Sequence, residues 1–251
     1  MQLHQIEREF GVPFAGEILD RSRWTQTALK SFPAEGRISW EALFGRKAPI
    51  IIDLGCGNGR YLIGSAVGRR DCDHLGIDTL PVVIRYARKR ANQRGLTNLR
   101  IAVGGAHELL DRWVEPHSVS EIHCYHPQPY YEASQVHRRL ITPSFLANVY
   151  RSLRPEGLFV IQTDNPGYWR YIREVVPVFF NFHERIGRWP DARRGRTRRE
   201  IMAMRKGLPI FRGHGTSKPD LSEETAMRLA EAMPVPTFDA DRRLRDMDHQ
   251  E

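Results

Sequence analysis

Two carboxylates flank a glycine-rich loop in the first third of the chain. Asp53 follows an apolar run, and Asp78 comes 19 residues after the loop, whose glycines are Gly55, Gly57 and Gly59. Glycines allow a tight turn and let a ligand lie against the backbone, and a helix that begins there points N–H groups at the ligand. A carboxylate before the loop repels a pyrophosphate and attracts a cation. The pattern therefore predicts a site for a small, partly cationic molecule.

The spacing of the glycines distinguishes between two classes of cofactor. Dinucleotide enzymes use Gly-x-Gly-x-x-Gly, whereas the third glycine here comes one residue early and Arg60 fills its slot. S-adenosylmethionine carries a cationic amino group and a sulfonium, and Asp78 is placed to bind both ribose hydroxyls. We expect it to be bound by the residues Asp53, Gly55, Gly57, Gly59, Asp78, Gly105 and Ala106. The adenine would meet backbone groups, His107 or Glu108; a nucleotide site or a structural glycine turn is the alternative.

A second loop, His126-Pro127-Gln128-Pro129-Tyr130-Tyr131, follows a later strand. In an open α/β sheet, ligands bind beyond the carboxyl ends of the strands, so this loop lies where a methyl acceptor belongs. The side chain of Gln128 both donates and accepts hydrogen bonds, and Tyr130 or Tyr131 can stack on a base. The alternative is a rigid proline turn that only shapes the domain.

The elements around these loops alternate between strand and helix. Strands are predicted over 48–54, 73–78, 98–103, 118–125 and 158–163, and helices begin at Arg60, Pro81 and Pro143. This alternation predicts a Rossmann-like α/β fold with a mostly parallel, doubly wound sheet, the class I S-adenosylmethionine-dependent methyltransferase architecture. Strand candidates at 178–186 and 210–216 would add a partly antiparallel edge.

The chain divides into three predicted parts. Residues 1–46 are an N-terminal extension with helical pieces such as 23–31, residues 47–216 form the catalytic domain, and residues 217–251 form a terminal helix and a mobile tail. A basic insert at about 185–206 carries nine Arg or Lys against two acidic residues. It fits a mobile arm that follows a phosphate backbone, although a charge run is also typical of a solvated face.

Bulk composition narrows the class of protein further. The chain has 251 residues, a net charge of +8 and a pI of about 9.7. A basic surface favours a nucleic-acid partner, although a merely basic enzyme would share it. No apolar run is long enough for a membrane span or a signal peptide, so a cytoplasmic protein without membrane contact is expected. Three cysteines argue against a disulfide framework, and His123-Cys124-Tyr125-His126 lacks the Cys-x-x-Cys pair of a zinc site, so no metal is expected.

Taken in order, several segments resemble the tRNA (guanine-N7-)-methyltransferases. The resemblance runs from about residue 23 to residue 215. Its segments are 43–49 before the glycine loop, 94–100, 127–140, Thr163-Asp164-Asn165, and Thr197-Arg198-Arg199-Glu200 followed by Gly213-His214-Gly215. The resemblance implies the same fold, S-adenosylmethionine as cofactor and tRNA as partner, for a monomer or a homodimer.

The resemblance also implies roles for individual residues. The family loop reads Pro-Asp-Pro-Trp-x-Lys, and its aspartate is assigned to catalysis and guanine contact; this chain has Gln128, Tyr130 and Glu132 at those positions. Catalysis would fall to Gln128 and Asp164, because Asp164 can supply the missing charge, although it could equally cap the helix before Pro166. Substrate binding would involve Tyr130, Glu132, Arg138, Arg139, Asp164, Thr197, Arg198 and Glu200.

Two alternatives follow from the altered loop. One is a relative that binds RNA and cofactor with weak or no catalysis. The other is a methyltransferase for a different acceptor, because Gln128-Pro129-Tyr130-Tyr131 resembles the Asp/Asn-Pro-Pro-Tyr loop of amino-group methyltransferases without its second proline.

Overall fold

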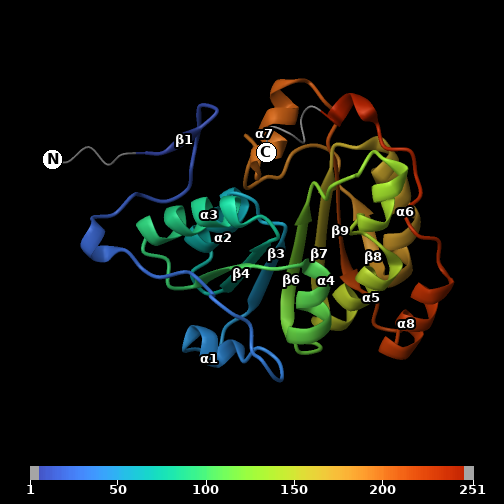
Figure 1. Cartoon of the computed structure of the whole chain (residues 1–251), viewed down its shortest axis with the longest axis horizontal. Coiled ribbons are helices and arrows are strands. Elements are labelled where there is room, and N and C mark those ends of the chain that lie inside the picture. Colours follow the sequence, from blue (N-terminus) through green and yellow to red (C-terminus); the bar gives the residue numbers. More distant parts are fainter. Residues whose placement is uncertain (1–5, 246–251) are drawn as a thin grey trace.

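A seven-stranded sheet forms the centre of the protein (Figure 1). The structure is a computed structural model that describes residues 6–245. Its strands run in the order β5-β4-β3-β6-β7-β9-β8. The parallel strands are β3 (Ile50–Leu54), β4 (Asp73–Asp78), β5 (Leu99–Val103), β6 (Val119–Tyr125) and β7 (Leu153–Thr163). Strands β8 (Phe180–Glu184) and β9 (Phe211–Ser217) are antiparallel to their neighbours. The predicted mostly parallel α/β architecture is confirmed.

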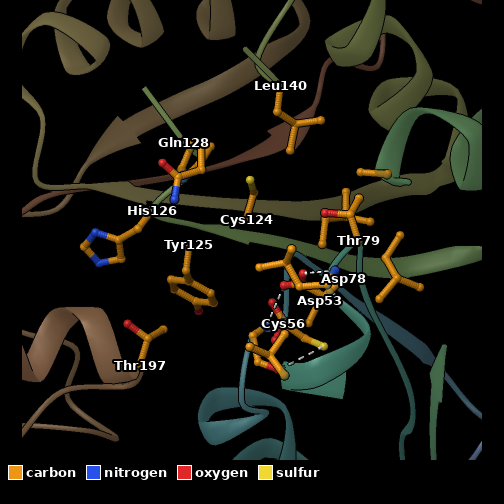
Figure 2. A pocket seen from close by; sticks show the side chains of 18 of the residues that line it. Asp53, Cys56, Asp78, Thr79, Cys124, Tyr125, His126, Gln128, Leu140 and Thr197 are labelled. Carbon is orange, nitrogen blue, oxygen red and sulfur yellow. Dashed lines mark hydrogen bonds between the residues drawn. The ribbon is translucent and has the colours of Figure 1, made fainter. Parts of the chain in front are cut away.

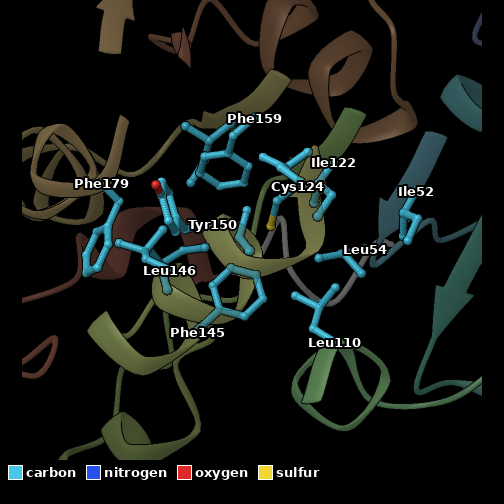
Figure 3. Close-up of a cluster of buried hydrophobic side chains, with 14 of the residues drawn as sticks. Ile52, Leu54, Leu110, Ile122, Cys124, Phe145, Leu146, Tyr150, Phe159 and Phe179 are labelled. Carbon is cyan, nitrogen blue, oxygen red and sulfur yellow. The ribbon is translucent and has the colours of Figure 1, made fainter. Parts of the chain in front are cut away.

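Helices cover both faces of this sheet. Helices α2 (Arg60–Gly68) and α3 (Pro81–Gln93) pack on one face, and the other carries α5 (Pro143–Ser152), α6 (Pro166–Phe179) and α8 (Glu223–Ala232). Alternate residues of a strand point to opposite faces. Ile52, Leu54, Ile122 and Cys124 therefore share one face of the sheet and belong to the same core cluster as Phe145 of α5 (Figure 3).

Capping residues explain where two of these helices begin. The Thr142 hydroxyl accepts the N–H of Phe145 at 3.1 Å, with Pro143 at the first helical position of α5. The Asn165 side chain accepts the N–H groups of Gly167 and Tyr168, with Pro166 at the same position of α6. Side-chain acceptors satisfy the free N–H groups of a first turn, and proline lacks the donor that would be left over there.

The N-terminal part folds differently from its prediction. The helix expected over 23–31 is wrong: Arg21–Arg23 form a single 3-10 turn, and Ala28 pairs with Ile101 of β5. The backbone N–H and the hydroxyl of Thr27 both donate to Asn92, at 2.9 and 2.8 Å, which holds this stretch extended along the sheet edge. Short elements complete this region: β1 (Arg8–Glu9), β2 (Val12–Pro13) and α1 (Trp40–Phe44).

The C-terminal part is also more ordered than expected. Helix α8 matches the predicted terminal helix, but the following segment, predicted to be mobile, packs against α6 as far as it is described. The Tyr171 hydroxyl donates to the carbonyl of Pro234 at 3.0 Å, and the ring of Phe238 lies 4.7 Å from that of Tyr168. Across residues 6–245, no helix is both long and apolar enough to cross a membrane, and no group of three potential metal ligands is found.

Candidate active site

A cavity of about 350 Å³ opens where the strand order reverses between β3 and β6. The connections that leave two neighbouring parallel strands run to opposite faces of the sheet at such a point, so the carboxyl ends of these strands frame a binding cleft. Asp53 and Asp78 lie on one side of the cavity, and Gln128 and Thr197 lie on the other (Figure 2). The predicted site residues that line the cavity are Asp53, Gly55, Gly57, Asp78, Ala106, Gln128, Tyr130, Arg138, Thr197 and Arg198.

The glycine loop forms an open cradle. Gly55 and Gly57 have φ values of +77° and +50°, and a Cβ atom at either position would meet no atom within 4 Å. These left-handed conformations favour glycine, and the free space leaves room for a ligand. Gly59 lies outside the cavity: its Cβ would come within 3.0 Å of the Ala87 side chain, so this glycine lets α2 approach α3.

Asp78 holds the cradle together at its other end. One carboxylate oxygen accepts the N–H of Gly57 at 3.0 Å, and the other accepts the N–H of Leu80 at 2.9 Å. A carboxylate has about four acceptor positions, so Asp78 retains capacity for two hydroxyl groups of a ligand.

Asp53 is a buried carboxylate without a described partner. It is 2% exposed, and its Oδ1 accepts no hydrogen bond from residues 6–245. Burial, and to a lesser degree the charge of Asp78, raises the pKa of Asp53 to about 8. Buried polar atoms are normally paired, so an orphaned carboxylate oxygen is evidence of an absent donor. A cationic amino group fits this position, as required for the predicted S-adenosylmethionine site.

The expected adenine side differs in detail. Gly104 and Ala106 line the cavity, whereas Gly105 is only the residue before the short helix α4 (Ala106–Glu108). His107 packs edge-on against Phe145, and Glu108 pairs with Arg112, so neither residue reaches the cavity. An apolar wall of Leu80 and Val83 takes their place. The sequence could have indicated this wall, because the apolar Leu80 comes two positions after Asp78, which ends β4.

The acceptor loop has an unusual backbone. His126 and Tyr130 have φ values of +51° and +41°, which residues other than glycine rarely adopt. Such strain collects at functional sites. Between them, Gln128 is exposed at the cavity, and its side chain forms no hydrogen bond with the described residues. The guanidinium of Arg138 lies 4.8 Å from the centre of the Tyr130 ring.

His126 connects this loop to strand β7. The Gln162 amide is placed to donate to His126 Nε2 at 2.8 Å, while its oxygen accepts the indole N–H of Trp189 at 2.6 Å. This network assigns the imidazole proton to Nδ1, which faces Asp164 at 3.5 Å. Sequence reasoning missed His126, because its partners are distant in the chain.

Asp164 does not line the cavity, and its charge is already compensated. Its carboxylate accepts the Nε–H of Arg199 at 2.7 Å, and both side chains are about 95% buried, with exposures of 5% and 4%. Burial works to raise the pKa of Asp164, but His126 and Arg199 outweigh it and hold the pKa well below its usual range. The alternative interpretation of Asp164 as a helix cap is wrong, since Asn165 caps α6.

Three further predicted substrate residues lie outside the cavity and bind other parts of the chain. Glu132 pairs with Arg245 at 3.1 Å. Glu200 is fully buried and accepts hydrogen bonds from Arg212 and from the backbone N–H of Arg196. Arg139 is 2% exposed and donates to four carbonyl groups.

The basic segment, residues 185–206, is built into the fold rather than free. Its second half forms α7 (Arg198–Arg205), and Trp189 is 5% exposed. Arg196 binds Asp191 and the Tyr125 hydroxyl, and it lies 4.0 Å over the Trp189 ring. Arg193 and Arg194 are exposed, and neither side chain makes a hydrogen bond or ion pair with residues 6–245. The interpretation as a mobile arm is therefore wrong for most of the segment.

Comparison with known proteins places this geometry in a family. A family model described as "Putative methyltransferase" matches residues 47–212. The tRNA (guanine-N(7)-)-methyltransferase of Nitrosococcus oceani is 30% identical over 70% of this chain and 75% of its own length. That of Chromohalobacter salexigens is 34% identical over 57% of this chain, and that of Paenarthrobacter aurescens 35% identical over 57%. The chain spans only 58% and 49%, respectively, of the length of these last two relatives.

Solved structures support the fold alone. The 16S rRNA methyltransferase KamB has a TM-score of 0.53 at 17% identity, over 72% of this chain and 93% of its own. The 16S rRNA (adenine(1408)-N(1))-methyltransferase of Catenulisporales acidiphilia has a TM-score of 0.51 at 14% identity, over 73% and 92%. The family model over residues 47–212 and the relative from Nitrosococcus oceani show the family. The chain belongs to the tRNA (guanine-N(7)-)-methyltransferase family.

Proposed function

We propose that this protein transfers a methyl group from S-adenosylmethionine to N7 of a guanine in tRNA. The observation that carries the proposal is the orphaned, buried Asp53 beside the glycine cradle and Asp78, in a cavity that opens directly onto the acceptor loop. The acceptor is inferred from the relatives, which are tRNA (guanine-N(7)-)-methyltransferases.

Different residues of the cavity bind different parts of the cofactor. Asp53 receives the cationic amino group, Asp78 the ribose hydroxyls, and the wall of Leu80 and Val83 covers the adenine. S-adenosylmethionine supplies an electrophilic methyl group on its sulfonium. Guanine N7 carries a free lone pair, so this chain needs no general base and must mainly align the two reactants.

The acceptor side orients guanine through neutral and cationic groups. Gln128 offers one amide oxygen to the N1–H and amino edge of the base, and Tyr130 offers a ring for stacking. Arg138, Thr197 and Arg198 line the same side. A carboxylate at position 128 would offset the positive charge that develops on the ring better than an amide does. We therefore propose a guanine-N7 enzyme whose charge stabilisation is weaker than that of a Pro-Asp-Pro loop.

RNA binding is proposed for a second cavity beneath the basic segment. This groove, of about 950 Å³, is lined by Arg193, Arg194 and Arg69, and Arg60 and Tyr61 line both cavities. Arg193 and Arg194 are exposed and form no ion pair with residues 6–245, so they can attract a phosphate backbone, whereas Arg69 is paired with Glu121. The groove thus offers a route for the strand that leads to the acceptor loop. We propose that residues 47–216 form the catalytic domain and that the protein meets tRNA in the cytoplasm.

One observation favours a second candidate, an RNA- and cofactor-binding relative without guanine methylation. The carboxylate of Asp164 is neutralised by Arg199, and position 128 carries no charge. Neither position 128 nor Asp164 therefore offers an uncompensated negative charge to a cationic product.

Nucleoside mass spectrometry distinguishes these candidates. Unmodified tRNA is incubated with the protein and methyl-labelled S-adenosylmethionine, digested and analysed, with Asp78→Ala as the cofactor-site control. Labelled 7-methylguanosine from the wild type alone supports the proposal. A different labelled nucleoside rejects the acceptor, and cofactor binding without any labelled product supports the second candidate.

A further inference from the structure

A C-terminal segment, residues 234–245, lies against the acceptor loop. Arg139 is the link: its guanidinium donates to the carbonyls of Pro129 and Tyr130 at 2.6 and 2.8 Å, and to those of Pro236 and Phe238 at 2.8 and 2.7 Å. One buried cation therefore joins two segments about a hundred residues apart.

Phe238 seats the segment on the rest of the fold. Its ring lies 3.8 Å from the Arg139 guanidinium carbon and packs on Tyr168 and Tyr171 of α6. A Cβ atom at Gly167 would come within 2.3 Å of the carbonyl oxygen of Asp239. The glycine therefore allows the segment to lie directly on the start of α6.

Arg139 also binds the part of the acceptor loop in which the backbone is strained. Tyr130 has a φ of +41°, and its carbonyl is one of the four acceptors of Arg139. Strained backbone persists only where surrounding contacts determine it, and four charged hydrogen bonds from one buried guanidinium provide such contacts. The ion pair of Glu132 with Arg245 is half exposed, so it contributes little to the stability of this contact.

We propose that the C-terminal segment is part of the acceptor site, and that Arg139 and Phe238 are positioning residues that hold residues 127–130 in the conformation that receives the base. This inference rests on the proposed function for its effect on catalysis, but the conformational claim stands independently. Arg139 acts through the loop backbone rather than by contact with RNA.

Hydrogen exchange tests the conformational claim without reference to activity. Phe238→Ala should increase exchange in residues 127–140 and leave residues 53–59 unchanged, and Phe238→Tyr should restore protection. Gly167→Ala provides a second route. Alanine normally favours a helix over glycine, so the same increase in exchange would arise from displacement of the segment. Val235→Ala is the matched control, because Val235 is 61% exposed in the same segment.

Kinetics then tests the effect on the reaction. Phe238→Ala should lower kcat/KM for tRNA by roughly tenfold or more, as expected for a misplaced acceptor group, with an unchanged Kd for S-adenosylmethionine. Unchanged exchange in Phe238→Ala and Gly167→Ala overturns the inference, as does an equal loss of cofactor and tRNA affinity. If the wild type makes no 7-methylguanosine, the proposed function fails. The exchange result still shows whether Arg139 and Phe238 hold residues 127–130 in place.

Discussion

The two sides of the cavity use carboxylates in opposite ways. On the cofactor side, Asp53 is buried with an orphaned oxygen, and Asp78 binds only backbone N–H groups. Behind the acceptor side, outside the cavity, Asp164, Glu132 and Glu200 are each paired with an arginine. A carboxylate can serve a ligand only while its charge is not already compensated within the fold. The cofactor side therefore offers carboxylate oxygens to a cationic ligand, whereas the carboxylates near the acceptor side are already paired with arginines.

The origin of this difference lies in a few positions of the chain. Arg199 stands where the resembling family segment, Thr-Lys-Phe-Glu, has an apolar phenylalanine, and it is this arginine that binds Asp164. Gln128 replaces the aspartate of the Pro-Asp-Pro loop. Gln128 removes a negative charge from the acceptor side of the cavity, and Arg199 compensates the charge of Asp164, which lies outside the cavity.

The largest effect is expected from Arg199→Met. This change removes the guanidinium that lies 2.7 Å from the buried Asp164 carboxylate, and breaking such a buried ion pair typically costs about 3–5 kcal/mol of stability. Denaturant unfolding measures this loss. Removing both charges in Asp164→Asn with Arg199→Met should recover most of it, because no uncompensated ion remains. If Arg199→Met instead kept its stability and methylated tRNA faster, Asp164 would be a catalytic group that Arg199 only restrains.

The cofactor side predicts a dependence of affinity on pH. The raised pKa of Asp53, about 8, means that the free protein holds a proton there at neutral pH. A cationic ligand favours the ionised carboxylate, so binding releases that proton, and affinity should rise by up to about tenfold per pH unit from pH 6 towards 8. Measurements end at pH 8 because the ligand amino group then begins to lose its own proton, at about 7.7–8.0 in model compounds.

Calorimetry in two buffers of different ionisation enthalpy detects the proton release. Asp53→Asn should bind more weakly, with a flat profile between pH 6 and 8. A wild-type affinity that is equally flat would show that no cation meets Asp53.

A smaller effect is expected in the groove beneath the basic segment. Arg193→Ala with Arg194→Ala should weaken tRNA binding and flatten the log–log dependence on salt by about 0.9 for each lost phosphate contact on a duplex. Arg85→Ala with Lys89→Ala is a control of equal charge, since both residues are exposed on α3. Equal slopes for the two double variants would mean that net charge alone attracts the RNA. Arg196 is left intact because it holds Trp189 and Asp191 in place.

Local pattern predicted the parts of the fold that depend on neighbours in the sequence. The parallel strands contain short apolar stretches, such as Ile50-Ile51-Ile52 of β3 and Leu158-Phe159-Val160-Ile161 of β7, and Asp53 and Asp78 lie at the carboxyl ends of β3 and β4. The apolar run around Val178 was less informative, because a short apolar stretch is compatible with a strand or a helix. A strand was predicted over 178–186, whereas α6 continues to Phe179 and β8 begins at Phe180.

Long-range charge pairing could not be predicted in the same way. Arg139, Arg199 and Glu200 appear in the sequence as polar residues near a substrate, but each has a partner farther along the chain: Arg139 binds Phe238 at 99 positions, Arg199 binds Asp164 at 35, and Glu200 binds Arg212 at 12. Only the tertiary structure shows that these side chains are buried and paired. For the same reason the tail, polar in composition, was expected to be mobile, although Phe238 packs against α6.

We propose that the acceptor loop still positions guanine N7 although Gln128 replaces an aspartate. Single-turnover formation of 7-methylguanosine by the wild type and by Gln128→Asp, with saturating S-adenosylmethionine, tests this proposal. Both proteins should form 7-methylguanosine, and Gln128→Asp should react faster, by at most about 1–3 kcal/mol in activation free energy. The proposal is contradicted if the wild type methylates a different acceptor and Gln128→Asp abolishes that activity without forming 7-methylguanosine.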